Sequence, residues 1–130
     1  MSGKRPGQRF RALPDHYAVC RLSADSSVPA WAAGPFVNIT FTTDELAIIC
    51  SASAVPANVR AERDWRVLKL VGPFPFTAVG VLASLATPLA EAGISLLSIA
   101  TYDTDYFLVK ADVLERAVSV LIAAGHTKIG

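Results

Sequence analysis

Short apolar segments bounded by turn-forming residues recur along the chain after residue 13. They are rich in β-branched and aromatic residues, a composition that favours strands. Strands are therefore predicted over residues 17–22, 36–41, 46–50, 66–71, 94–100 and 106–110, with a short closing strand within 126–129. Charged residues alternate with apolar ones around residues 66–70, which indicates a partly solvated strand.

Two longer segments place apolar residues three and four positions apart, which is the spacing of a helix with one buried face. The first covers residues 77–92, where Thr77 can cap the start and Gly93 stands just past the end. Pro88 lies inside this segment, and an interior proline bends or ends a helix at a cost of about 3 kcal/mol. We therefore expect a helix over 77–92 that bends before Pro88.

The second helical segment covers residues 113–124. Asp112 and Glu115 have the spacing of a capping box at its start, and Gly125 follows its end. From residue 65 onward the predicted order is strand, helix, strand, strand, helix, strand. This order is that of the ferredoxin-like α+β arrangement, an antiparallel sheet with helices on one face.

An internal repeat is the most informative feature of the sequence. Thr43-Asp44 and Thr104-Asp105 each precede an apolar strand, and an aromatic residue, Phe41 or Tyr102, stands three positions before each aspartate. The helical stretch of the first copy is limited to one or two turns around 30–33. We therefore expect two tandem ferredoxin-like units, the first of them abbreviated. A Thr-Asp pair at a hairpin also has a structural use, because both side chains bond turn backbone.

Composition and charge bound the function. The chain has 130 residues, 52% of them hydrophobic and 18% charged, with a formal net charge of +1. It can bury a core. A net charge this close to zero does not indicate the strongly basic surface that binds nucleic acid or an acidic membrane. Basic residues cluster before residue 12, so we expect a flexible basic tail over 1–12, a first unit over 13–62 and a second over 63–130. A nucleic-acid-binding arm is the alternative for the tail.

The two cysteines, Cys20 and Cys50, each sit in an apolar run and are expected to be buried hydrophobes rather than a metal site. No secretory or membrane-spanning segment is recognisable, so a cytoplasmic location is expected. No catalytic motif is present, and His16 and His126 fit ordinary surface histidines better than a catalytic pair. The sequence therefore predicts a protein that is not an enzyme and needs no metal or cofactor.

Several stretches together resemble the ACT domain family, specifically tandem ACT proteins similar to the regulatory region of aspartate kinase and to the animal cytosolic arginine sensor. These stretches are residues 25–29, 41–46, 69–74, 92–95 and 101–106, and the resemblance spans 13–130. It implies βαββαβ units that pair side by side and often bind an amino acid where two copies meet. It also implies a homodimer and a regulatory role, acting on a separate enzyme or regulator.

Carried onto this chain, the resemblance assigns a ligand site at the junction of the two units. The loop at Gly72 and Pro73 falls where the family wraps a ligand, and Thr101, Tyr102 and Asp105 fall on a facing strand and turn. Ser27 and Val28 match a serine-valine pair that lines the site from the other half. The family loop often carries an acidic or amide side chain, whereas here Pro73 is followed by Phe74, Pro75 and Phe76, which disfavours a basic ligand.

The chemistry of a free amino acid supports the same residues. Its ammonium group needs an anion, which Asp105 can supply, and its carboxylate needs donors such as backbone N–H groups beside Gly72. Ser27 and Thr101 add hydroxyls, and Tyr102, Phe74 and Phe76 can wall the ligand side chain.

Two other functions stay open. One is an ACT-type dimerisation or protein-interaction module without ligand, and the other is RNA binding, which the scarcity of aromatic and basic residues on the central strands disfavours.

Overall fold

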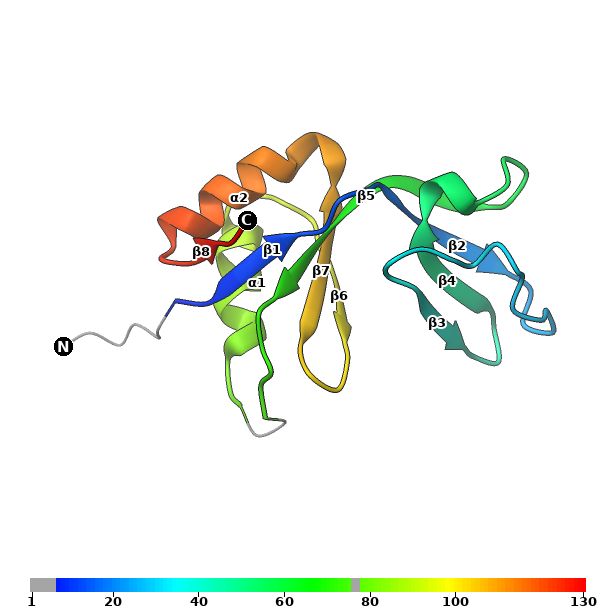
Figure 1. Ribbon diagram of the computed structural model, residues 1–130, viewed down its shortest axis with the longest axis horizontal. Coiled ribbons are helices and arrows are strands. Elements are labelled where there is room, and N and C mark those ends of the chain that lie inside the picture. The colour runs from blue at the N-terminus through cyan, green and yellow to red at the C-terminus, as the bar shows by residue number, and fades with distance from the viewer. Residues whose placement is uncertain (1–6, 76–77) are drawn as a thin grey trace. The chain divides into compact units, whose positions relative to one another are not determined.

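The computed structural model describes residues 7–75 and 78–130 and divides the chain into two compact units (Figure 1). Among the described residues, one unit contains 7–14 together with 66–75 and 78–130, and we call it the C-terminal unit. The other contains residues 15–65, and we call it the inserted unit because its sequence interrupts the first. The structure therefore differs from the predicted division at 13–62 and 63–130, since the N-terminal segment belongs to the C-terminal unit.

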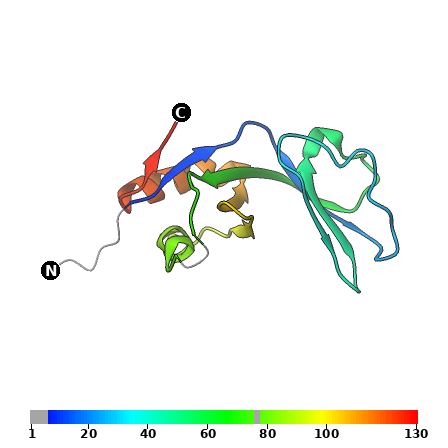
Figure 2. The same cartoon turned by 60° about the horizontal axis from the view of Figure 1, so that its bottom comes forward.

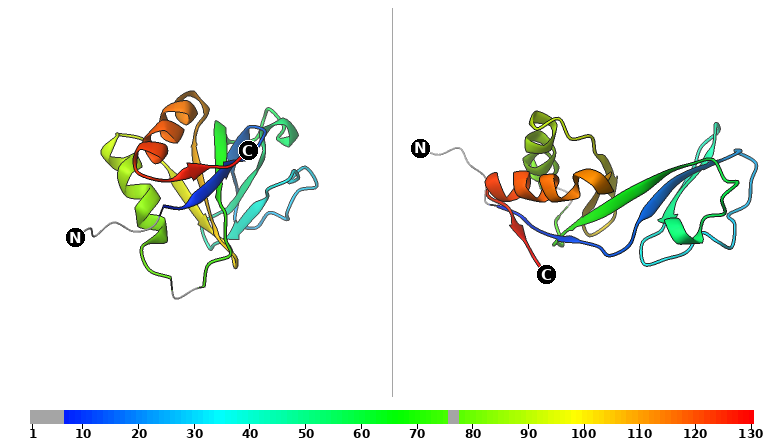
Figure 3. Two further views of the ribbon diagram at one scale, coloured as in Figure 1. Left: turned by 60° about the vertical axis from the view of Figure 1, so that its left-hand side comes forward. Right: turned by 90° about the horizontal axis from the view of Figure 1, so that it is seen from above.

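The C-terminal unit has the predicted order of strands and helices. Its elements after the inserted unit are the end of β5 (Ala61–Leu70), α1 (Val81–Glu91), β6 (Leu97–Ala100), β7 (Asp105–Lys110), the short 3₁₀ turn η2 (Ala111–Val113), α2 (Leu114–Ala123) and β8 (Thr127–Lys128). Both helices lie on the same side of β1 and β5 (Figures 2 and 3). The α+β class, with helices on one face of an antiparallel-rich sheet, is confirmed.

A strand within the predicted flexible tail corrects that prediction. Residues 9–12 form β1 (Arg9–Ala12), which pairs antiparallel with β5 and parallel with β8. Phe10 is fully buried in the core, whereas Arg9 and Arg11 point to the opposite face. The cluster of basic residues hid this alternation, so the segment was taken for a solvated tail. Residues 1–6 lie outside the described part.

The core of this unit lies between the sheet and the two helices. Its fully buried large side chains come from β1, β5, β7, α1 and α2, and they are Phe10, Leu68, Leu70, Leu85, Leu89, Phe107, Val109 and Leu121. Leu85 and Leu89 are one turn apart on α1, as the predicted stripe requires. Each large aliphatic or aromatic side chain buried here contributes roughly 1.5–3 kcal/mol relative to exposure.

The helix boundaries differ from the predicted ones at their starts. Helix α1 begins at Val81 instead of 77, and Gly80 precedes it with a φ of 78° and no side-chain cap. The predicted cap, Thr77, lies outside the described residues. Helix α2 also starts without a side-chain cap, because Asp112 lies within η2 and Val113 occupies the capping position. Without a capping side chain, the first N–H groups of each helix depend on other partners.

Helix α1 continues through Pro88 to Glu91, and a buried histidine compensates for the proline. Residue 88 would normally donate its N–H to the Ser84 carbonyl, but proline has no N–H. The Nε2 atom of His126 lies 2.8 Å from that carbonyl oxygen, and the backbone N–H of Gln8 donates to Nδ1 at 2.9 Å. Nδ1 therefore accepts and Nε2–H donates. His126 is 6% exposed, so the prediction of a surface histidine was wrong.

The inserted unit is a small sheet. It contains β2 (Tyr17–Leu22), β3 (Asn38–Phe41), β4 (Leu46–Ser51), the 3₁₀ turn η1 (Ala52–Ala54) and the beginning of β5, in the spatial order β3-β4-β2-β5. Its core holds Ala18, Cys20, Leu46, Ile48, Cys50 and Val55. The short helix predicted around 30–33 is absent, and a turn stands at 30–31 instead. The first copy is therefore more abbreviated than expected.

The two predicted repeats do correspond, but in a different register. Thr42 and Thr101 each open a four-residue turn and bond, through both backbone N–H and side-chain hydroxyl, the carbonyl oxygen three residues later. The flanking pairs Phe41↔Leu46 and Ala100↔Asp105 occupy equivalent places. The predicted match of Thr43-Asp44 with Thr104-Asp105 was therefore wrong, because it followed letter identity rather than turn chemistry.

Candidate functional site

Two hollows flank the turn between β6 and β7 in the C-terminal unit. The first, which we call the helix-side cavity, encloses about 220 Å³ between this turn and the start of α1. Its lining is Phe74, Pro75, Ala78, Gly80, Val81, Leu82, Ala100, Thr101, Tyr102, Asp103, Thr104 and Asp105. Three predicted site residues, Thr101, Tyr102 and Asp105, therefore lie together around one cavity.

The second hollow, which we call the open-face cavity, encloses about 230 Å³. Its lining is Arg11, Lys69, Val71, Gly72, Pro73, Asp103 and Thr104. Arg11 and Lys69 are cross-strand partners and alternate with the core residues of β1 and β5, so they lie on the sheet face opposite the helices. Gly72 and Pro73 thus line a different cavity from Thr101, Tyr102 and Asp105.

The turn that separates the cavities is fixed by its own hydrogen bonds. The Thr101 hydroxyl donates to the Thr104 carbonyl at 2.9 Å, and the Thr104 hydroxyl donates to the Leu70 carbonyl at 2.9 Å. Thr104 is 7% exposed, so this second bond ties the turn to β5 in the interior. The prediction that the Thr101 hydroxyl serves a ligand therefore competes with a structural role that the hydroxyl already performs.

Gly72 also has a structural role. A Cβ atom at this position would lie 2.9 Å from the Asp103 carbonyl oxygen, closer than real Cβ contacts. The N–H of Phe74 donates to that same oxygen at 2.8 Å, and the Gly72-Pro73 bond is cis. Since Pro73 and Pro75 have no N–H, the loop offers a ligand carboxylate fewer donors than the sequence suggested.

The first turn of α1 offers the donors that the loop lacks. The first N–H groups of a helix have no intrahelical partner, and this end carries partial positive charge. Gly80, Val81 and Leu82 stand at this end and line the helix-side cavity. Asp105 is half-buried at the start of β7 on the other side of the same cavity. An anion-binding helix end and a carboxylate therefore share one cavity.

The remaining predicted residues belong to the inserted unit. Ser27 and Val28 follow β2 in an exposed loop, where Val28 is 42% exposed. The predicted wall residue Phe76 lies outside the described residues. Sequence reasoning missed Asp103 and Leu82 in the cavity lining. Asp103 lies between the predicted Tyr102 and Asp105, in a turn whose register the repeat misplaced. Leu82, which is 40% exposed, lies in the predicted helix 77–92, where apolar spacing indicates the core rather than a cavity.

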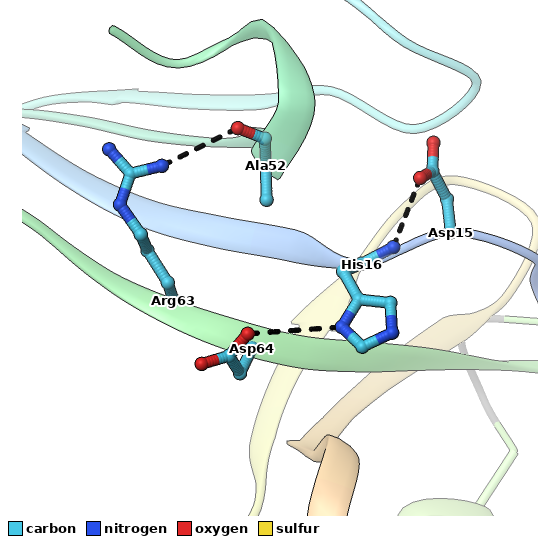
Figure 4. Close-up of polar contacts among 5 residues, drawn as sticks. All are labelled: Asp15, His16, Ala52, Arg63 and Asp64. Carbon is cyan, nitrogen blue, oxygen red and sulfur yellow. Dashed lines mark hydrogen bonds and ion pairs between the residues drawn. The ribbon is translucent and has the colours of Figure 1, made fainter. Parts of the chain in front are cut away.

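Polar groups at the start of β2 do not form a catalytic arrangement (Figure 4). The Ser51 hydroxyl donates to Asp15 Oδ2 at 3.1 Å, and Asp15 Oδ1 accepts from the backbone N–H of His16 rather than from its ring. The His16 ring faces Asp64, with Nδ1 3.9 Å from Oδ1, and both side chains are mostly exposed. A Ser-His catalytic arrangement places the histidine ring beside the serine hydroxyl, whereas the Ser51 hydroxyl bonds a carboxylate.

Other chemistry is sparse within the described residues. Cys20 and Cys50 are free and buried, as predicted, and burial raises the pKa of both thiols, that of Cys20 to about 11. No group of three or more metal-ligating side chains occurs in residues 7–75 and 78–130. In the same part of the chain, neither helix has the length and apolarity needed to cross a membrane.

The order of elements, with two helices on one face of the sheet, defines the C-terminal unit as a ferredoxin-like α+β domain. Residues 60–123 match the family model described as an ACT domain, and a second model, described as an N-terminal domain, matches residues 15–58. The segment of residues 60–123 belongs to the ACT domain family. The resemblance stated from the sequence is thereby confirmed.

Curated relatives match part of the chain. The cytosolic arginine sensor for mTORC1 subunit 1 of Homo sapiens is 38% identical over 58 residues, which are 44% of this chain and 18% of that protein. The Bos taurus protein of the same name matches to the same extent. The chain therefore corresponds to less than a fifth of the length of these relatives.

Solved structures match nearly the whole chain. An Agrobacterium tumefaciens protein has a TM-score of 0.91 at 38% identity, over 96% of this chain and 94% of its own. The regulatory subunit of aspartate kinase from Thermus flavus has a TM-score of 0.65 at 12% identity, over 92% of this chain and 99% of its own. This second likeness shows a shared fold.

Proposed function

We propose that this protein is a non-catalytic regulatory module that binds a free amino acid in the helix-side cavity of its ACT domain. The observation that carries the proposal is the placement of Asp105 across this cavity from the start of α1. The ACT family match and the identity shared with a protein named an arginine sensor support a regulatory role.

The cavity suits the two charged groups of an amino acid. The N–H groups at the start of α1 would donate hydrogen bonds to the carboxylate, because a helix N-terminus favours negative charge. Asp105, with Asp103 beside it in the lining, would pair with the ammonium group. Because the helix end and the aspartates stand on opposite sides of the cavity, the two charged groups of the ligand would fix its orientation. Phe74, Pro75 and Leu82 would then contact its side chain.

The charge and the volume of the cavity limit which amino acids it can bind. The described lining contains two aspartates and no lysine or arginine, so acidic amino acids are disfavoured. The volume of about 220 Å³ lies below the roughly 300–1,000 Å³ of most small-molecule pockets. We therefore propose a neutral or basic amino acid, and so the charge of the cavity reopens the basic ligands that the apolar loop after Pro73 disfavours.

Thermal unfolding in the presence of each of the twenty amino acids tests this proposal. A ligand present at ten times its Kd stabilises the native state by about 1.4 kcal/mol, which raises Tm by a few degrees. Asp105→Asn should abolish the shift while leaving the unliganded Tm close to that of the wild type. Asp112→Asn is the matched control, because Asp112 is exposed and outside the cavity lining, and should keep the shift. A panel in which none of the amino acids shifts Tm at 10 mM would refute ligand binding.

The predicted contribution of Ser27 and Val28 remains a proposal with its own test. If this loop completes the site, Ser27→Ala should weaken the amino-acid shift without changing the unliganded Tm, since Ser27 is exposed. Ser26→Ala is unsuitable as a control because its hydroxyl lies 3.0 Å from that of Ser23. Ala24→Ser, at an exposed position of the same loop, changes a hydroxyl without touching the predicted pair.

A second candidate function, an interaction module without ligand, rests on one edge strand. β3 stands at the end of the strand order. Ile39 and Phe41 within it and Val37 just before it alternate onto one face, and they are 37%, 64% and 37% exposed. Edge strands usually carry charges that discourage pairing, and β3 has none. If the module is a homodimer through this edge, Phe41→Lys should give monomers in light scattering. Monomeric wild-type protein would refute homodimerisation through this edge.

The cellular location and the target of regulation are proposed from the curated relatives. The relative with 38% identity is named a cytosolic sensor, so we propose a cytoplasmic location and action on a separate enzyme or regulator. Fractionation of cells that express the tagged protein tests the location. Recovery in the membrane or secreted fraction would contradict it.

A further inference from the structure

The open-face cavity is built around two cations placed directly opposite each other. Arg11 on β1 and Lys69 on β5 are register partners, so their Cβ atoms stand about 4.5–5.5 Å apart on the same face. Like charges at such a pair destabilise a sheet by a few tenths of a kcal/mol or more. A pairing of this kind is relieved when an anion lies between the two side chains.

Neither cation has an anionic partner within the described part of the chain. The Lys69 ammonium lies 5.9 Å from the centre of the Tyr106 ring, a cation–π contact that leaves its charge in place. Among the described residues, Arg11 forms no side-chain hydrogen bond or ion pair. The Nη1 atom of Arg11 lies near Gly130, since a Cβ atom added at Gly130 would stand 4.0 Å from it.

The two cavities beside the β6–β7 turn thus differ in charge. Among the described residues, the helix-side cavity is lined by two acids and no lysine or arginine, whereas the open-face cavity is lined by two cations and one acid, Asp103. No ion pair joins Asp103 to Arg11 or Lys69 in the described residues. The excess positive charge of the open-face cavity therefore stays available to a ligand.

We propose that the open-face cavity is a second ligand site, which binds the phosphate or carboxylate group of a small molecule between Arg11 and Lys69. The guanidinium of Arg11 presents paired donors that match two oxygens of such a group, and Lys69 adds a point charge. The cavity of about 230 Å³ accommodates one anionic group and a small remainder. The two cavities share Asp103 and Thr104 in their linings, but this proposal rests on Arg11 and Lys69 and does not depend on the amino-acid site.

Thermal unfolding of the full chain with inorganic phosphate or acetate, each against chloride at equal ionic strength, tests the site. We expect at least one of the two anions at 20 mM to raise the wild-type Tm by about 2 °C or more above chloride. Arg11→Gln and Lys69→Gln should each abolish that rise. Their Tm in low-salt chloride should equal or exceed that of the wild type, because either substitution removes the opposed charges.

Arg9→Gln is the matched control. Arg9 is an exposed arginine on the same strand and face as Arg11, two positions away, and lies outside the cavity lining. This variant should keep the full anion response, and so should Asp105→Asn, which disables the proposed amino-acid site alone. The proposal is overturned if neither anion exceeds chloride, or if the rise persists in both Arg11→Gln and Lys69→Gln. It is also overturned if Arg9→Gln loses the rise equally, which would indicate diffuse surface charge.

Discussion

Replacing His126 and Pro88 together should show that the histidine compensates for the proline. In the native chain the Ser84 carbonyl receives the Nε2–H of His126 at 2.8 Å because Pro88 has no N–H to give. Substituting Pro88 by alanine restores an N–H at the position that normally bonds Ser84 in a helix. The histidine should then matter less.

The expected magnitudes follow from the two bonds of the imidazole. His126→Ala removes the acceptor of the Gln8 N–H and the donor to Ser84, and each buried group left unsatisfied costs about 1–3 kcal/mol. We expect a loss of about 2–5 kcal/mol in the native background. In the Pro88→Ala background the loss should be smaller by about 1–2 kcal/mol, because the Ser84 carbonyl keeps a partner.

Urea unfolding followed by circular dichroism at 222 nm measures the four free energies of this cycle. The cavity left by the histidine is the same in both backgrounds, so it cancels in the difference. His16→Ala serves as the control, since His16 is exposed in the inserted unit and should show no coupling with position 88. If His126→Ala costs the same in both backgrounds within about 0.5 kcal/mol, the compensation argument is refuted.

Three further predictions concern the turn and the buried thiols. Gly72→Ala should destabilise the protein by about 1–3 kcal/mol in urea unfolding, because the new Cβ would lie 2.9 Å from the Asp103 carbonyl oxygen, and an unchanged midpoint would contradict this contact. Thr104→Val should cost about 1–3 kcal/mol, because it leaves the buried Leu70 carbonyl without its hydroxyl donor; a neutral effect would show that another group takes over. Burial and the neighbouring thiol raise the pKa of Cys20 from 9.0 to about 11, so the unfolded thiol ionises first, and the associated stability is complete below pH 9 and is lost toward pH 11. Unfolding measured between pH 8 and 11 should therefore lose up to about 1.4 kcal/mol per pH unit from this thiol, and Cys20→Ala should reduce that slope.

The strands and the α+β class were predictable because they depend on local patterns of apolar residues. The order of elements after residue 65 follows from periodicity, and the burial of Cys20 and Cys50 follows from their apolar neighbours. β1 was not predicted because a four-residue strand gains its stability from partners distant in sequence, β5 and β8. Its alternation of arginine with Phe10 and Ala12 was present in the sequence but too short to decide between strand and tail.

The start of α1 and the role of His126 could not be predicted from neighbouring residues in the sequence. A proline in a helical pattern indicates a lost hydrogen bond, but not which distant group replaces it. The replacement comes from a residue 42 positions away. The repeat shows that local sequence identity can also mislead. The two hairpins share the turn bonds of Thr42 and Thr101, whereas the identical residues, Thr-Asp in each copy, stand at positions that do not correspond.

Part of the lining of the proposed site, Thr101, Tyr102 and Asp105, was predictable, whereas the structural roles of its neighbours were not. This difference decides which variants test function. Gly72 and Thr101 were assigned to a ligand, yet each is required by the turn itself, so a loss of binding on their substitution would not distinguish a damaged fold from a lost contact. Asp105, Arg11 and Lys69 line the cavities without a side-chain hydrogen bond or ion pair in the described residues. Their charges can therefore be removed at little structural cost. A ligand effect that disappears with these charges, at unchanged unliganded stability, is attributable to binding alone.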